Sequence, residues 1–440
     1  MPPHVLVIGA GFTGLALAYD LTRRGIAVTV VEQEDNVGGL AGSFDAGNLK
    51  LEKFYHHWFV SDQDVITLIR ELGTEQHLVF RKSRTAVHHR GGVSRLSSPL
   101  DLLTFRPLSL LNRLRMGLLP FQAQRVRDWK RLEDLTAQEW LVRLGGEEVY
   151  HTVWEPLLLG KFGPYAREIS AVWMWNKLKL RGGSRGRWGA ETLAYYRGGF
   201  AALLEKMVAE IRMRGGEVHT ALSVDGLISD GCQVRGVTAG GHTLEADAVV
   251  ATTALPAVAQ YLEPHVDLVY TAQLRRIEYL ANVCLVLVLD RQLSDVYWLN
   301  VTDPGFPFVG IIEHTNLESS DTYGGRHIIY LSKYLMPSDP LFSFSGGQVL
   351  KHALPHLEQM FPGFHVSWIV DYRVWSSLYA QPVVVRHFSR LVPAPVTPLR
   401  GFFICTMAQI YPEDRGTNYA IREGRRMSRL VAAFLGKTSS

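Results

Sequence analysis

VLVIGAGFTGLALAYDLTRRGIAVTVVE, residues 5–32, decides the fold of this chain. It opens with a short apolar run typical of a buried strand and passes through a glycine-rich turn into a helical pattern. It ends in a second apolar run that contains three valines. A strand, a helix and a second strand in this order predict a βαβ unit with parallel strands. The stretch therefore predicts an α/β fold.

Three glycines in this stretch predict a dinucleotide site. Gly9 permits the tight turn, Gly11 lets the backbone approach a diphosphate, and Gly14 allows close packing of helix against strand. The N-terminus of the helix offers free N–H groups to the anion. Glu32 ends the second strand, where its carboxylate can bind a ribose diol and disfavours a 2′-phosphate. Their neighbours complete this part of the expected site: Phe12, Thr13 and Gln33.

The motif leaves three alternatives open: a glycine turn without ligand, an NAD site and an FAD site. A second glycine pair, Gly38-Gly39, follows shortly after Glu32 and can bring more backbone amides to the same diphosphate. A plain dehydrogenase has no need of such a pair, so we favour FAD. The residues expected around this second turn are Gly38, Gly39, Leu40 and Ala41.

Composition bounds the class of protein. The 440 residues carry a formal charge of +4 from 46 basic and 42 acidic side chains, which does not indicate a nucleic-acid partner. The three cysteines lie far apart, so no metal site is expected. The sequence shows no signal-peptide pattern and no apolar run of about 20 residues, the length that a spanning helix needs. We expect a cytoplasmic protein without a transmembrane span, either free or peripheral to a membrane.

Hydrophobic periodicity predicts an interleaved, two-domain organisation. Helical patterns dominate much of the first half, and β-branched and aromatic runs suit an antiparallel sheet later in the chain. The run 248–252 is expected to rejoin the first sheet. The predicted segments are a first FAD-binding part (1–60), a mainly helical substrate or cap part (61–198), a second FAD-binding part (199–260), an antiparallel-sheet substrate domain (261–390) and a C-terminal FAD-binding part (391–440).

The first 60 residues, the Gly38-Gly39 segment, the run 247–252 and the C-terminal stretch resemble the FAD-dependent amine oxidase superfamily, which includes protoporphyrinogen oxidases and phytoene desaturases. This resemblance implies a Rossmann-type, glutathione-reductase-like FAD-binding domain. It also implies that the Val224 backbone meets the adenine and that the C-terminal loop holds the flavin ring. Relatives often carry Gly-Asp where this chain has Cys405-Thr406, which leaves the ribityl contacts to Glu413 or Asp414. The remaining expected FAD contacts are Thr252, Gly416, Thr417, Asn418 and Ala420.

Residues 53–59, KFYHHWF, resemble a K-Y-G-A-H-I-F segment of UDP-galactopyranose mutases, a match that implies a place for His57 beside the flavin. Histidine against a flavin can exchange a proton near neutral pH, so His57 and His56 are catalytic candidates. Arg415 is the third. Alternatively, the two histidines are packed in the core, and Arg415 forms an ion pair on the surface.

Two groups of residues are candidates for contact with the substrate. Glu313 and His314 end an apolar strand and can project into a cavity, or simply cap the strand. Tyr334, Trp375 and Tyr379 offer ring faces to a sugar or polycycle, and Arg373 can pair with a phosphate or carboxylate, although aromatic residues on a sheet often belong to the core. The segment 100–129 mixes large apolar residues with five arginines, which suits an anionic membrane, a lipid-linked substrate or an ordinary surface.

Three functions follow from these residues. The first is an FAD-dependent oxidoreductase that transfers hydride from a bulky organic substrate to flavin N5. The second is a sugar isomerase like UDP-galactopyranose mutase, in which reduced FAD acts as nucleophile. The third is a flavin-bound protein without turnover. The expected partner is a small molecule, either a sugar nucleotide, a polycycle or a lipid-linked compound.

Overall fold

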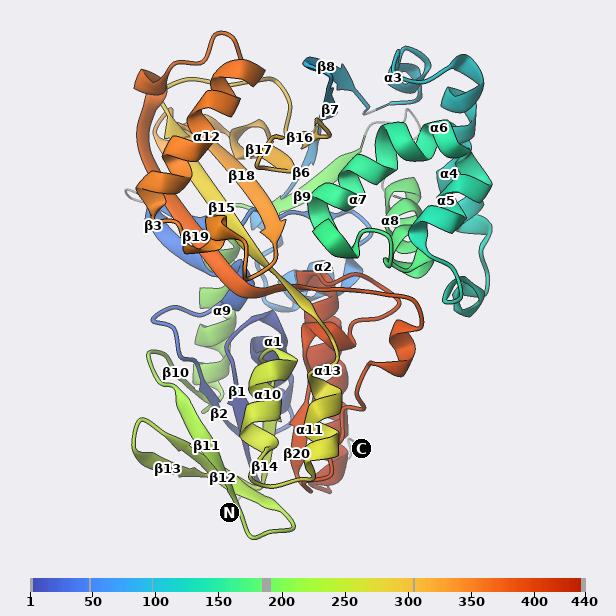
Figure 1. Ribbon diagram of the computed structural model, residues 1–440. Coiled ribbons are helices and arrows are strands. Elements are labelled where there is room, and N and C mark those ends of the chain that lie inside the picture. The colour runs from blue at the N-terminus through green and yellow to red at the C-terminus, as the bar shows by residue number, and fades with distance from the viewer. Residues whose placement is uncertain (1–2, 47–48, 97, 184–190, 304, 437–440) are drawn as a thin grey trace.

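The computed structural model describes residues 3–46, 49–96, 98–183, 191–303 and 305–436. A parallel sheet and its helices form the lower half of Figure 1, and a larger sheet and a group of helices form the upper half. Residues 184–190, which belong to the segment predicted to be mainly helical, lie outside the described residues.

The lower half is built on a five-stranded parallel sheet in the order β10-β2-β1-β14-β20. Leu6 of the first strand pairs with Thr29 on one side and Val249 on the other, so the run 248–252 rejoins the first sheet as expected. The chain therefore contributes to this sheet from three separate regions. The strands are β1 (His4–Ile8), β2 (Ala27–Val31), β10 (Glu217–His219), β14 (Ala248–Ala251) and β20 (Phe402–Ile404).

Both faces of the parallel sheet are buried, which explains the unbroken apolar runs of its strands. Val5 and Val7 belong to the core cluster shared with three helices, whereas Leu6 and Ile8 belong to the cluster shared with an antiparallel meander. This alternation follows from the two-residue period of a strand. The helices are α1 (Phe12–Arg23), α9 (Gly199–Met213) and α13 (Thr417–Phe434), and the meander consists of β11 (Val224–Ser229), β12 (Val234–Ala239) and β13 (His242–Glu245).

The upper half contains a seven-stranded sheet in the order β19-β15-β18-β17-β16-β7-β8. Its neighbouring strands are antiparallel except for β16 and β7. Two of its strands, β7 and β8, come from the segment 61–198, which was predicted to be mainly helical. The strands are β7 (Thr85–His89), β8 (Gly92–Arg95), β15 (Tyr279–Leu289), β16 (Trp298–Val301), β17 (Gly310–Glu313), β18 (His327–Leu335) and β19 (Ile369–Pro382). A long helix, α12 (Gly346–Met360), packs against β15 and β19.

The helical segment lies beside this sheet (Figure 1). It follows α2 (Gln63–Glu71), after which Gly73 has φ +67°, the left-handed conformation that commonly ends a helix. A small sheet of β5 (Trp58–Phe59), β9 (Thr192–Tyr196) and β6 (Leu78–Lys82) connects it to the rest. The helices are α3 (Pro99–Leu103), α4 (Leu110–Arg125), α5 (Ala137–Gly145), α6 (Glu147–Val149), α7 (Glu155–Phe162) and α8 (Ala171–Gly183).

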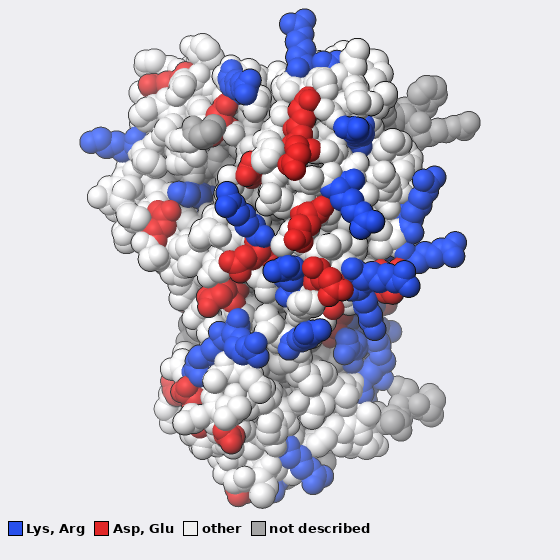
Figure 2. Space-filling model, turned by 45° about the vertical axis from the view of Figure 1, so that its right-hand side comes forward, with Lys and Arg blue, Asp and Glu red and all other residues white. Residues whose placement is uncertain are grey.

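Charge on the molecular surface is mixed in sign. On the face shown in Figure 2, acidic and basic side chains are interspersed. Across the part of the chain that the structure describes, none of the helices combines the length and the apolar composition needed to cross a membrane.

Candidate functional site

The turn between β1 and α1 has the geometry of an anion cradle. Gly9 has φ +103°, which favours glycine, and Gly11 is the N-cap residue of α1 and has no side chain with which to cap it. A Cβ atom on Gly11 would meet only the Gly38 carbonyl oxygen, 3.9 Å away. On Gly14, by contrast, it would lie 2.0 Å from the Gly9 carbonyl oxygen. Gly11 therefore keeps open the space in front of the helix N-terminus, and Gly14 permits close packing of helix and strand.

Glu32 stands at the end of β2 beside this cradle and is almost fully buried. Its carboxylate accepts hydrogen bonds from the backbone N–H of Ala10 at 2.8 Å and of Glu34 at 3.0 Å. These two bonds fix the carboxylate at the mouth of the turn and leave lone pairs for further donors. The position suits recognition of a ribose diol.

The second glycine turn lies directly on the first. The N–H of Gly38 donates to the Ala10 carbonyl oxygen at 2.9 Å, and Gly11 and Gly38 form an isolated parallel bridge. Gly38 and Gly39 have φ of +123° and +56°, both in the region that favours glycine. The two turns therefore present backbone amides to one volume.

A cavity of about 1030 Å³ runs from these turns to the N-terminus of α13. This volume is at the upper end of the range for ligand sites, roughly 300–1000 Å³. The cavity brings together most of the residues that the sequence suggested, from both ends of the chain. They are Gly9, Gly11, Phe12, Thr13, Glu32, Gln33, Gly38, Gly39, Leu40, Ala41, His56, His57, Thr252, Tyr334, Trp375, Tyr379, Asp414, Arg415, Gly416, Thr417, Asn418 and Ala420.

The N-terminus of α13 closes the far end of the cavity. Gly416 is its N-cap residue, so backbone N–H groups of the first turn face outward without a capping side chain. Thr417 accepts a hydrogen bond from the Trp58 indole at 2.7 Å, and Asn418 accepts one from the Val65 N–H at 3.1 Å. These bonds hold the helix start against β5 and α2, where its positive end can stabilise an anion.

Arg415 precedes this helix and is held on two sides. Its guanidinium donates to the Tyr334 hydroxyl at 2.7 Å and to the Gln381 side-chain oxygen at 3.1 Å. Burial acts against the charge, but Tyr334 and Asp414 outweigh it and hold the pKa of Arg415 above its usual range. Arg415 is therefore a fixed cation on the cavity wall.

The two histidines differ in their surroundings. His56 hydrogen-bonds the Phe54 carbonyl oxygen through Nδ1 at 2.7 Å, and burial lowers its pKa to about 4, so it is neutral at pH 7. His57 hydrogen-bonds the Tyr297 hydroxyl through Nδ1 at 2.9 Å. Tyr297 is fully buried, and it fixes the orientation of the His57 ring at the cavity wall.

Several cationic and aromatic residues of the cavity wall were missed from the sequence, among them Lys161, Lys177 and Tyr55. Lys177 lies 2.6 Å from the Asp414 carboxylate and Lys161 lies 4.0 Å from it. Burial opposes ionisation of Asp414, but these lysines and Arg415 hold its pKa well below its usual range. Both lysines come from the helical segment, 16 residues apart in α7 and α8, and no local pattern marks them.

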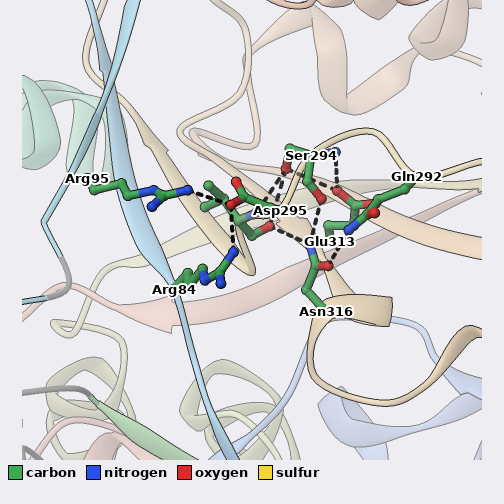
Figure 3. Close-up of polar contacts among 8 residues, drawn as sticks. Arg84, Arg95, Gln292, Ser294, Asp295, Glu313 and Asn316 are labelled. Carbon is green, nitrogen blue, oxygen red and sulfur yellow. Dashed lines mark hydrogen bonds and ion pairs between the residues drawn. The ribbon is translucent and has the colours of Figure 1, made fainter.

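Two expected substrate residues, Glu313 and His314, are absent from the wall of this cavity. Glu313 is fully buried and accepts hydrogen bonds from the N–H groups of Leu293 and Ser294 and from the Ser294 hydroxyl. Figure 3 shows this carboxylate beside Asn316 and the 292–295 turn. His314 hydrogen-bonds the Tyr323 hydroxyl at 2.7 Å. These polar groups are engaged at the strand end and do not line this cavity, and a substrate contact of either residue stays a prediction.

Four more expected residues lie outside the cavity wall. Arg373 is half exposed, pairs with Asp371 at 2.6 Å, and lines a separate cavity of about 420 Å³, because its strand turns this side chain outward. Glu413 forms a two-pronged ion pair with Arg422 at 3.0 Å, which occupies both its oxygens. Val224 is buried at the start of β11, and Gly14 is covered by the Gly9 carbonyl. For Arg373 and Glu413, direct ligand contact in this cavity is therefore not supported.

The described ranges contain no group of three or more His, Cys, Asp or Glu side chains that could hold a metal ion.

Comparisons with known proteins agree with this geometry. The model of the family described as flavin containing amine oxidoreductase matches residues 12–432. Zeta-carotene desaturase of Synechocystis sp. (strain ATCC 27184 / PCC 6803 / Kazusa) is 23% identical over 91% of this chain and 91% of its own length. The putative protoporphyrinogen oxidase of Exiguobacterium sp. 255-15 shares the fold, with a TM-score of 0.77, 17% identity and coverage of 98% and 99% of the two chains. Reduced UDP-galactopyranose mutase does so too, with a TM-score of 0.77, 15% identity and coverage of 99% and 94%. The fold is thus a Rossmann-type domain with an interleaved substrate domain, and the chain belongs to the flavin-containing amine oxidoreductase family.

Proposed function

We propose that the protein is an FAD-dependent oxidoreductase that accepts hydride from a bulky organic substrate. Family membership implies a flavin cofactor. The adenine dinucleotide form is our inference from two glycine turns and a buried ribose-side carboxylate that share one volume.

One observation carries the proposal: a single cavity joins the glycine turns to the N-terminus of α13. The residues fit the cofactor because Gly11 has space for the diphosphate, whereas a side chain there would fill that space. Uncapped N–H groups stand at both ends, at the starts of α1 and α13. Such helix starts favour the negative charge of a diphosphate at one end and of a reduced ring at the other.

When bound, the flavin supplies a two-electron acceptor at N5. The chain contributes binding, orientation and exclusion of water. Trp375 and Tyr379 form part of the wall, with Trp375 packed 5.2 Å from the ring of Phe44. Arg415 provides fixed positive charge, and His57, oriented by Tyr297, can hold or pass on a proton at Nε2.

The cations of the wall offer partners to an anionic group of the substrate, beside the carboxylates of Glu32, Glu34, Asp62, Glu191 and Asp414 that line the same cavity. Three cations, Lys161, Lys177 and Arg415, surround one carboxylate, that of Asp414. A carboxylate or phosphate on the substrate can pair with a cation of this group. Substrates of this kind include polycyclic carboxylic acids, sugar nucleotides and lipid-linked phosphates.

A second candidate is a flavin-dependent isomerase of the UDP-galactopyranose mutase kind. The specific observation in its favour is that three cations, Lys161, Lys177 and Arg415, line the cavity and can pair with the phosphates of a sugar nucleotide. His57, matched to the mutase segment, lines the same cavity. Both functions share the cofactor and differ in whether the substrate is oxidised.

Anaerobic spectroscopy of the purified protein tests the proposal. We expect a yellow protein that releases FAD on denaturation and bleaches when an oxidisable substrate is added without oxygen. A panel of polycyclic acids, sugar nucleotides and polyprenyl phosphates covers the substrate classes. Turnover of a sugar nucleotide only after dithionite reduction would favour the isomerase and overturn the oxidoreductase. Protein that contains another cofactor would overturn both.

A further inference from the structure

Helices α3 and α4 expose an unusual concentration of large apolar side chains. Among the described residues, eighteen large apolar side chains are exposed, and seven of them fall between residues 100 and 121. Their exposed fractions range from 49% to 71%. They are Leu100, Leu103, Leu110, Leu111, Leu114, Leu118 and Phe121, which we call the leucine face. Single exposed apolar residues are ordinary, whereas a cluster of this kind marks an interaction site.

The sequence of α4 gives this helix two apolar faces. At about 100° per residue, the five exposed residues of α4 fall within roughly 100° of its circumference. The opposite face holds Leu119 and Ala123, which are fully buried and pack into the core of the helical segment. The buried side therefore accounts for the attachment of α4 to the protein, and the leucine face is not needed for that attachment.

Arginines flank the leucine face. Residues 102–127 contain five arginines and no aspartate or glutamate, although the whole chain carries only a small positive excess. On α4 itself, Arg113 and Arg115 fall on the two sides of the apolar stripe, and Arg125 lies at its C-terminal end. Arg106, Arg115, Arg125 and Arg127 are exposed. An apolar stripe bordered by arginines is the arrangement of a helix that lies in a membrane interface.

We propose that the leucine face docks the protein on an anionic lipid surface. The leucine face can contact acyl chains, and the arginines beside it can pair with phosphate headgroups. A second copy of this chain would bring four exposed arginines against four exposed arginines, which disfavours self-association. Figure 1 shows α3 and α4 at the outer edge of the helical segment, away from the parallel sheet, so that a flat surface can reach them.

Vesicle co-sedimentation of the holoprotein tests this proposal. We expect binding to vesicles of phosphatidylcholine mixed with phosphatidylglycerol, and weak binding to phosphatidylcholine alone. The variant Leu114→Gln/Leu118→Gln/Phe121→Gln should lower the partition coefficient by about tenfold or more. Arg125→Gln/Arg127→Gln should lower it on anionic vesicles only, by about fivefold for each arginine.

A matched control comes from α11 (Leu268–Leu274), where Leu268 and Val269 are exposed by 68% and 65%. Leu268→Gln/Val269→Gln should bind vesicles like the wild type. Equal loss in this control, or wild-type protein that stays in solution with both vesicle types, would overturn the proposal. So would a lipid-free dimer that the triple α4 variant converts to monomer. Because the substituted side chains are exposed, circular dichroism and flavin content should be unchanged in every variant.

Discussion

A Cβ atom placed on Gly14 would lie 2.0 Å from the carbonyl oxygen of Gly9, whereas one on Gly11, three residues earlier, would meet nothing closer than 3.9 Å. Two glycines of one motif therefore serve different purposes. Gly14 belongs to the packing of the fold, and Gly11 belongs to the ligand volume.

Substitution separates these purposes. Gly11→Val should give a folded but colourless protein, because its backbone, at φ −72° and ψ 178°, accepts any residue and the side chain fills the diphosphate space. Gly14→Ala should lower the free energy of unfolding by about 3 kcal/mol, because backbone must move. Flavin absorbance per protein and urea unfolding report the two effects. A yellow, fully loaded Gly11→Val protein would remove the cofactor from this cavity.

Glu32→Gln should weaken cofactor binding without unfolding the protein. Glutamine replaces one carboxylate oxygen by an NH₂ group, which cannot accept a hydrogen bond. The backbone N–H of either Ala10 or Glu34 therefore loses its acceptor. A lost or mismatched bond to a charged acceptor costs about 1.5–3 kcal/mol, or roughly tenfold to a hundredfold in affinity. Reconstitution of the apoprotein with FAD measures this change. The nearby Asp35→Asn, at an exposed side chain outside the cavity wall, is the control and should bind like the wild type.

Asp414→Asn should destabilise the protein more than Lys177→Met. Removing the carboxylate leaves Lys161, Lys177 and Arg415 facing one another, whereas removing Lys177 leaves two cations beside Asp414. Breaking a fully buried pair costs about 3–5 kcal/mol, and the partial exposure of Lys177 reduces our expectation to about 2 kcal/mol for Asp414→Asn. Urea unfolding at pH 7 measures both variants. The reverse order would contradict the charge balance described here.

Glu313 should make stability fall as pH rises. Burial raises its pKa to about 7, so the folded protein holds this proton more tightly than the unfolded chain does. The free energy of unfolding therefore decreases from about pH 4.5 to about pH 7 and the Glu313 contribution is constant above that range. Glu313→Gln should remove this contribution. His327 Nδ1 lies 3.8 Å from the Glu313 carboxylate, and His327→Gln serves as the control for titration of this histidine. An unchanged slope in Glu313→Gln would contradict the assignment.

The nucleotide half could be predicted from the sequence because its signals are local or strongly periodic. The glycine turn and α1 are adjacent in the chain, and the run at β14 is apolar on both faces, as a buried parallel strand requires. By contrast, β7 forms beside β16, more than 200 residues away, so its strand state depends on a partner that no local pattern reveals.

The substrate side of the site was harder to predict for the same reason. Glu313 and His314 stand at the end of an apolar strand, and the sequence alone does not tell a cap from a ligand contact. The donors to Glu313 come from the 292–295 turn, which precedes the strand in the chain and carries no local signal of this contact. Lys161 and Lys177 reach the cavity only because α7 and α8 fold back on the C-terminal loop.

The three separate contributions to the parallel sheet have a consequence for biosynthesis. On the ribosome, β1 emerges early, but β14 and β20 cannot pair until residues 251 and 404 have left the exit tunnel. The nascent chain thus carries exposed strand edges through most of translation, a state prone to aggregation and to chaperone capture. A premature stop before residue 402 would remove β20 and α13 together and leave a product unable to bury the edge of β14.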